Sequence, residues 1–177
     1  IDEAIYRTSN RGASWTRASV DFAVNALHFF SPNLGIATGD GGAIRFSNDG
    51  GATWIGMNSP STADLGAQFW LDESRGFVLG NRFTETEENG TTVSWPDECL
   101  LLATEDGGGL WTERAVVDGL ACTSLQVLPD ANTLFVLAYA RQDAEHTVAH
   151  LLRSSDAGLS LDDLALPTEV GSLRMMM

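Results

Sequence analysis

The chain is organised around Ser47-Asn48-Asp49-Gly50-Gly51-Ala52-Thr53-Trp54. Weaker copies of this octapeptide occur at residues 8–15 (TSNRGASW), 104–111 (TEDGGGLW) and 154–161 (SSDAGLSL). The shared pattern is Ser/Thr-x-Asp-x-Gly-x-Ser/Thr-Trp. Asparagine replaces the aspartate in the first copy, leucine replaces the second Ser/Thr in the third, and leucine replaces the tryptophan in the last. A single Asp-Gly turn is common in proteins, but four copies in register indicate a repeat architecture.

Each copy has the composition of a tight turn between two antiparallel strands. A short carboxylate accepts hydrogen bonds from the backbone N–H groups of its own turn and replaces the ladder bonds lost at the bend. The glycine suits a backbone with positive φ, and the tryptophan suits packing beside a neighbouring sheet. The positions for which we therefore predict a structural role are Thr8, Asn10, Gly12, Ser14, Trp15, Ser47, Asp49, Gly51, Thr53, Trp54, Thr104, Asp106, Gly108, Trp111, Ser154, Asp156, Gly158 and Ser160.

Short apolar strands separated by turn signals surround each copy. Residues 21–60 predict four strands, with the octapeptide joining the third strand to the fourth. The same order recurs at residues 61–117, with an insertion at 82–98, and at residues 118–168, with a smaller insertion at 142–147. Residues 1–20 supply only the last two strands of such a unit, and residues 169–177 supply the start of a further one.

This repeat predicts an all-β fold, a β-propeller of four-stranded antiparallel blades in a single segment over residues 1–177. The chain holds about three and a half blades, whereas propellers typically close with four to eight. We therefore expect an incomplete propeller, an open arc with bare strand edges. Such a chain is either a fragment of a larger propeller or a protein that pairs with another chain.

These residues resemble the Asp-box, or bacterial neuraminidase repeat, superfamily. Over residues 34–54 the chain is similar to the photosystem II stability/assembly factor type, which has a Gly-apolar-x-x-Gly strand, a Gly-x-Ile strand and then Asp-Gly-Gly-x-Thr-Trp. Later units depart from that type, since residues 134–138 contain neither glycine. The resemblance implies a non-enzymatic propeller that acts as a protein-interaction or assembly scaffold. The alternative is a glycan-acting or glycan-binding propeller, sialidase-like or xyloglucanase-like.

Enzyme chemistry has little support in the residues. Sialidases carry Phe/Tyr-Arg-Ile-Pro, which the chain lacks, and among 24 acidic residues a pair of carboxylates suitable for a glycosidase arises by chance. The histidines at 28, 146 and 150 are scattered, and no nucleophile-elbow motif supports a Ser-His-Asp triad. Each octapeptide offers one carboxylate rather than the ligand set of a calcium loop. We predict no enzyme activity, no cofactor and no bound metal.

Composition narrows the range of partners. The 24 acidic and 10 basic residues, all of them arginines, give a net charge of −14. The electrostatic field of this negative charge repels phosphate groups and anionic lipid, so nucleic acid is not an expected partner. The chain contains no run of about 18 apolar residues, so we expect no transmembrane helix and no membrane insertion. It begins at Ile1 without a basic-then-apolar segment, so we expect a signal peptide to be absent or already removed. We expect a protein partner, with a glycan as the alternative, and we favour an extracytoplasmic location, whether secreted, periplasmic or lumenal.

The insertion at residues 82–98 is the predicted partner-binding surface. Loops that vary between repeats are where a scaffold acquires a partner, whereas the repeated turns are structural. Trp95 is the predicted apolar anchor, and Glu85, Glu87 and Glu88 are expected to steer a basic surface. The alternative is an acidic loop that only keeps the protein soluble, with the tryptophan tucked beneath it.

The two cysteines, Cys99 and Cys122, come close together in the predicted topology. Cys99 ends the loop between the second and third strands of one blade, and Cys122 follows the link to the next blade. Both connections emerge on the same face of a propeller, so a disulfide between them is possible. Two buried free thiols are the alternative.

Overall fold

A computed structural model describes residues 3–88, 90–142, 146–164 and 166 of the chain. Within these residues the chain forms β-strands and one 3-10 turn, η1 (Asp40–Gly42), and has no α-helix. The strands are β1 (Ala4–Arg7), β2 (Thr16–Ser19), β3 (Val24–Phe29), β4 (Gly35–Gly39), β5 (Ile44–Ser47), β6 (Ile55–Gly56), β7 (Asp64–Trp70), β8 (Gly76–Glu88), β9 (Thr91–Thr104), β10 (Thr112–Asp118), β11 (Ala121–Val127), β12 (Leu134–Arg141), β13 (Thr147–Ser154) and β14 (Asp162–Leu164).

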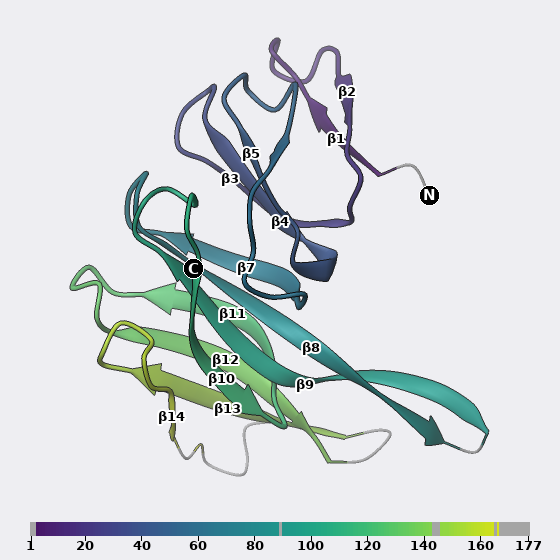
Figure 1. Cartoon of the computed structure of the whole chain (residues 1–177), viewed down its shortest axis with the longest axis vertical. Coiled ribbons are helices and arrows are strands. Elements are labelled where there is room, and N and C mark those ends of the chain that lie inside the picture. Colours follow the sequence, from purple (N-terminus) through teal and green to yellow (C-terminus); the bar gives the residue numbers. More distant parts are fainter. Residues whose placement is uncertain (1–2, 89, 143–145, 165, 167–177) are drawn as a thin grey trace.

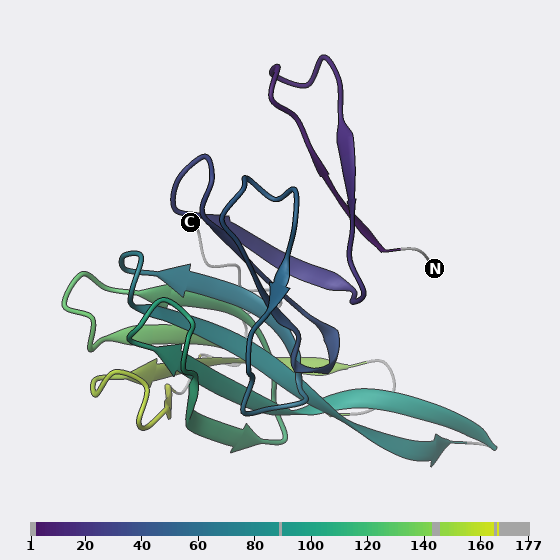
Figure 2. The same cartoon turned by 45° about the horizontal axis from the view of Figure 1, so that its top comes forward.

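The strands form four antiparallel sheets, and in each sheet neighbours in sequence are neighbours in space. β1 and β2 make a two-stranded sheet, and the other sheets have the orders β3-β4-β5-β6, β7-β8-β9-β10 and β11-β12-β13-β14. The sheets follow one another along an arc, from β1 and β2 at one end to β11–β14 at the other (Figure 1, Figure 2). The chain is thus an all-β, partial β-propeller in which each four-stranded sheet is a blade.

The apolar core lies between successive sheets. In β4, Ala37 faces the β1–β2 sheet while Ile36 faces the following blade. In β9, Leu100 and Leu102 face the preceding blade while Leu101 faces the following one. Because successive residues of a strand point to opposite faces, a strand covered on both sides needs an unbroken apolar run. This requirement explains the runs Gly35–Gly39 and 99–103, which are buried throughout.

The insertion at residues 82–98 is a regular strand pair, which the sequence analysis did not predict. β8 and β9 continue past the blade as one ribbon, in register from Gly76 opposite Thr104 to Glu88 opposite Thr91, with a bulge between Arg82 and Phe83. This ribbon projects beyond the other strands of its blade (Figure 2). The four threonines of the ribbon and Val93 are β-branched, and such residues favour an extended conformation even where both faces are polar.

Two predicted features fall at the limits of the described chain. The smaller insertion lies between the end of β12 at Arg141 and the start of β13 at Thr147, and residues 143–145 are outside the described part. The predicted start of a further blade at residues 169–177 also lies outside it. In the part of the chain that the structure describes, no helix has the length and hydropathy needed to cross a membrane.

Candidate functional site

In the octapeptide turn between β5 and β6, Ser47 and Asp49 hold the backbone in place. The amide of Gly51 donates to Oγ of Ser47 at 2.8 Å, and the amide of Thr53 donates to Oδ1 of Asp49 at 2.9 Å. The Thr53 hydroxyl donates to Oδ2 of Asp49 at 2.7 Å. The hydrogen bonds from Thr53, the hydroxyl first, stabilise the carboxylate and lower the pKa of Asp49 to about 2. The carboxylate is therefore committed to its own turn.

The other copies repeat this geometry. In the last copy the Ser160 hydroxyl donates to Asp156 Oδ2 at 2.7 Å, and this bond makes the largest contribution to a pKa of about 2 for Asp156. In the third, the amide of Leu110 donates to Asp106 Oδ1 at 2.9 Å. The first copy reverses one bond, because the Asn10 amide group donates to the Ser14 hydroxyl at 2.8 Å. Asparagine thus substitutes for aspartate without leaving a turn amide unpaired, since the amide of Ser14 still donates to Asn10 Oδ1 at 2.9 Å.

In each of the three four-stranded blades, a further hydrogen bond joins the octapeptide to the turn between the first two strands of the same blade. The residue after the aspartate donates its backbone N–H to a carbonyl of that turn at 2.8–2.9 Å. The three pairs are Gly50 to Asn33, Gly107 to Ser74 and Ala157 to Asn132. The sequence analysis missed this contact, because it joins segments whose separation differs from blade to blade. Both turns on this side of a blade are consequently fixed to each other.

The tryptophans of the octapeptides differ in burial. Trp111 is 3% exposed and packs with Ile36 and Ile44 of the preceding blade. Trp54 is partly buried against the β1–β2 sheet. Trp15 is 60% exposed, since the described residues place no sheet on that side of β1 and β2. The tryptophan position therefore packs each blade onto the one before it where such a blade is present.

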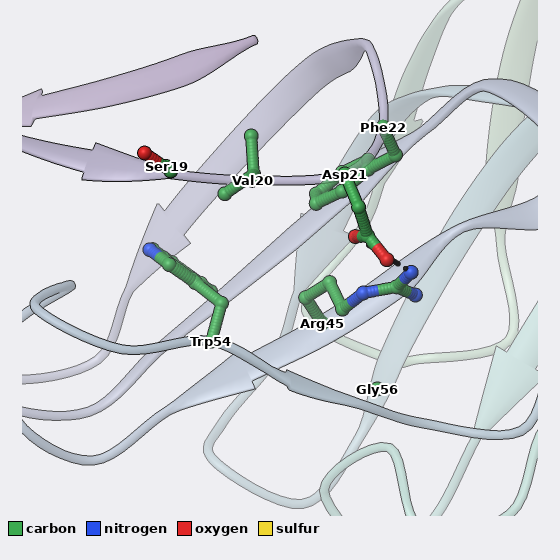
Figure 3. A pocket seen from close by; sticks show the side chains of 7 residues that line it. All are labelled: Ser19, Val20, Asp21, Phe22, Arg45, Trp54 and Gly56. Atoms are coloured by element: carbon green, nitrogen blue, oxygen red, sulfur yellow. Dashed lines mark hydrogen bonds and ion pairs between the residues drawn. The ribbon is translucent and has the colours of Figure 1, made fainter. Parts of the chain in front are cut away.

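A pocket of about 490 Å³ lies where the β1–β2 sheet meets the first full blade. Figure 3 shows Arg45 and Trp54 on one wall, facing the segment that links β2 to β3. The guanidinium of Arg45 forms an ion pair with Asp21 at 3.1 Å and lies 4.9 Å from the centroid of the Phe22 ring. The ion pair joins the two walls of the pocket, and thereby the two sheets. Because the one arginine that lines the pocket is neutralised in this way, the pocket offers no uncompensated positive charge to a ligand.

The ribbon at residues 82–98 carries the predicted partner-binding residues, but on two faces. Directly opposed residues of an antiparallel pair point to the same side. Thr84 is opposite Trp95, whereas Glu85 is opposite Ser94. Trp95 therefore faces away from Glu85 and Glu87, and the single patch expected from the sequence is divided. Glu88 is paired with Thr91 at the ribbon's end, and its side chain lies outside the described part.

Trp95 is covered by the following blade. It is partly buried, and the guanidinium of Arg141, at the end of β12, lies 4.0 Å from the centroid of its ring. On the other face of the ribbon, Phe83 is 49% exposed and shares its side with Glu85 and Glu87. The exposed aromatic residue of the ribbon is thus Phe83, which the sequence analysis had not selected.

A disulfide joins Cys99 of β9 to Cys122 of β11, with a Cα–Cα distance of 5.2 Å. It connects the second full blade to the third. Asn81 reinforces the same junction, because its side chain accepts a hydrogen bond from the amide of Cys122 at 2.8 Å and donates one to its carbonyl at 2.9 Å.

Two of the histidines, His28 and His150, lie within strands, in β3 and β13 respectively. His28 lies among Phe30 and Trp70, with ring centroids at 4.6 and 6.0 Å, and desolvation lowers its pKa. His150 pairs with Asp163 at 2.6 Å across β13 and β14. Within the described residues no group of three histidine, cysteine or acidic side chains could hold a metal ion.

The fold and its repeated turns define the class: the chain is related in fold to β-propeller proteins. It is similar to the structure of YCF48 bound to a D1 peptide, with a TM-score of 0.58 and 16% identity, over 92% of this chain and 42% of that one. The chain thus spans less than half the length of that protein. The chain is also similar to YCF48 from Cyanidioschyzon merolae, with a TM-score of 0.49 and 14% identity over 95% of this chain and 68% of that one. A third similar structure is an ancestral GH74 enzyme, with a TM-score of 0.45 and 12% identity over 90% of this chain and 28% of that one. No family model matches the sequence, and no curated protein matches it.

Proposed function

We propose that the chain is a non-enzymatic scaffold that binds a protein partner, and that the ribbon at residues 82–98 provides the contact surface. The observation that carries this proposal is the exposure of Phe83, Glu85 and Glu87 on one face of a strand pair that extends beyond its blade (Figure 2). An exposed aromatic residue bordered by charges is typical of interaction surfaces. On this proposal Trp95 supports the ribbon from behind, through its contact with Arg141.

The opposite side of the blades is less available to a partner. There the octapeptide carboxylates accept hydrogen bonds from their own turns, and the turns are tied to one another. A fold like this one can bind a polypeptide, since the similar YCF48 structure is a complex with a D1 peptide. That likeness supports the class of partner and says nothing of its identity.

Glycan binding, the second candidate, would be favoured by arginines that converge without carboxylate partners. Four of the described arginines are instead held in ion pairs with carboxylates, at 2.7–3.1 Å. They are Arg45, Arg75, Arg82 and Arg114. We therefore favour the protein-binding scaffold.

Site-specific photo-crosslinking tests the proposal. The photoreactive residue benzoylphenylalanine is placed at position 85, on the ribbon, or at position 73, in the turn between β7 and β8, and each protein is irradiated in an extract of the source organism. We expect a partner that cross-links from position 85 only and is displaced by excess unlabelled protein. A variant in which residues 83–96 are replaced by Asn-Gly should fail to displace it while keeping its melting temperature. Equal cross-linking from both positions, or full displacement by the shortened variant, would overturn the proposal.

A further inference from the structure

The β8 edge of the ribbon has no partner strand. β7 begins at Asp64, which lies opposite Asn81, and among the described residues no strand pairs with β8 on that side from Arg82 to Glu88. On its other side β8 is paired with β9 along the same length. Every second residue of such an edge therefore presents its backbone N–H and C=O groups outward. The ribbon thus offers seven residues of unpaired strand.

A groove runs beside this edge at the base of the ribbon. It measures about 580 Å³, and its walls include Ala63, Asp64, Phe83 and Ser94. The groove lies beside the first residue of β7, Asp64, so a chain lying in it would continue the line of β7 along β8. Phe83 supplies an exposed apolar contact there. The base of the ribbon therefore combines open space, an exposed aromatic side chain and unpaired backbone groups, which an added strand requires.

The charge of this region is negative. Glu85 and Glu87 follow Phe83 at every second position, on the same face of the ribbon. The one arginine at the base, Arg82, is neutralised by Glu98 and Glu113, each at 2.7 Å. Two copies of this acidic edge would repel each other, which disfavours a second copy of the chain as the occupant. A basic strand would be attracted to it.

We propose that the free edge of β8 is a strand-addition site for an extended segment of a partner protein in which basic side chains alternate with apolar ones. The backbone of the segment pairs with residues 82–88. On the face of the ribbon that carries Phe83, its basic side chains meet Glu85 and Glu87. Strand addition derives affinity from backbone hydrogen bonds and specificity from alternate side chains. This inference rests on the proposed function and specifies the kind of partner segment.

The test uses a fluorescent ten-residue peptide of alternating lysine and valine, and a control peptide of the same sequence and charge that is N-methylated at every second residue. Binding to the full chain is measured by fluorescence anisotropy at low salt. We expect saturable binding of the first peptide and, because N-methylation removes several backbone hydrogen bonds, at least about tenfold weaker binding of the second.

Matched variants locate the site. Glu85→Gln combined with Glu87→Gln should weaken binding by about three- to tenfold, and Phe83→Ala by about fivefold. The control Glu73→Gln combined with Glu105→Gln removes the same charge from two turns away from the ribbon and should leave binding unchanged.

Three results would overturn the inference, and they separate it from the proposed function. If both peptides bind equally, attraction is by charge alone and strand addition is wrong, while the ribbon can still be the partner surface. If no saturable binding occurs below about 1 mM, the edge does not accept such a strand. If the variant with residues 83–96 replaced by Asn-Gly binds the peptide as well as the full chain, the peptide binds elsewhere and the ribbon loses its support as a contact surface.

Discussion

The disulfide between Cys99 and Cys122 makes a quantitative prediction. The bond closes a loop across 23 positions of the sequence. Cross-linking a loop of this length removes chain entropy from the unfolded state that corresponds to about 3.4 kcal/mol at 25 °C. For a chain of 177 residues, each kcal/mol moves the melting temperature by about 2–4 °C. We therefore expect reduction to lower the melting temperature by about 7–14 °C.

The assay compares the oxidised protein, the same protein in dithiothreitol, and the variant Cys99→Ala combined with Cys122→Ala. Urea unfolding followed by circular dichroism gives the free energy of unfolding, and mass spectrometry after alkylation counts the free thiols. Reduction should have no effect on the double alanine variant, which is the control for the reductant. A loss below about 1 kcal/mol in the wild-type protein, with the thiols shown to be free, would refute the entropic account.

Three further predictions, tested by five substitutions, concern the turns and their contacts. The substitution Gly50→Ala should cost at least about 1–2 kcal/mol of stability, because Gly50 has a φ of 70° and an added Cβ would lie 2.8 Å from the Pro32 carbonyl oxygen. Ala157→Gly, at φ 57°, should instead gain about 0.5 kcal/mol. Both are measured by urea unfolding, and changes of the same sign in both variants would contradict this. The folded pKa of Asp49 lies below its usual value, so the stability that its carboxylate contributes is present above about pH 4 and is lost as the pH falls toward 2. The melting temperature of the Asp49→Asn variant should therefore fall less than that of the wild type between pH 4 and pH 2. The same pH dependence in both proteins would argue against this role. Trp111→Ala should cost about 3–5 kcal/mol in urea unfolding and Trp15→Ala less than about 1 kcal/mol, because only the first is buried; equal losses would show that Trp15 is packed in solution.

The turns could be predicted because their determinants are local. Ser47, Asp49 and Thr53 bind one another and the amides between them within eight residues, so the sequence alone contains the interaction. The meander of each blade follows from the same reasoning, since a turn between antiparallel strands places neighbours in sequence side by side.

The ribbon and its contacts were harder to predict. A signal for the strand pair was present in the dipeptide Asn89-Gly90, typical of a two-residue hairpin, but the high content of acidic residues suggested a polar loop. The contact between Trp95 and Arg141 joins two blades and depends on how the sheets stack, which no local pattern encodes. The exposure of Phe83 depends in turn on where β7 begins relative to β8.

The tie between the two turns of each blade also bears on how this architecture could be engineered. On the side of the blade that carries the octapeptide turns, the Gly107 amide donates to the Ser74 carbonyl and so fixes the β9–β10 turn to the β7–β8 turn. A change of length in either turn would break this hydrogen bond. The connection between β8 and β9 is held differently. In the described residues the Asp97 carbonyl accepts a hydrogen bond from the amide of Gly119 at its base, and Trp95 contacts Arg141, while β8 and β9 extend as a ribbon above the blade. That connection is therefore a suitable grafting position, where a foreign binding sequence could replace residues 83–96 and be displayed on a support that keeps Asp97 and its hydrogen bond to Gly119.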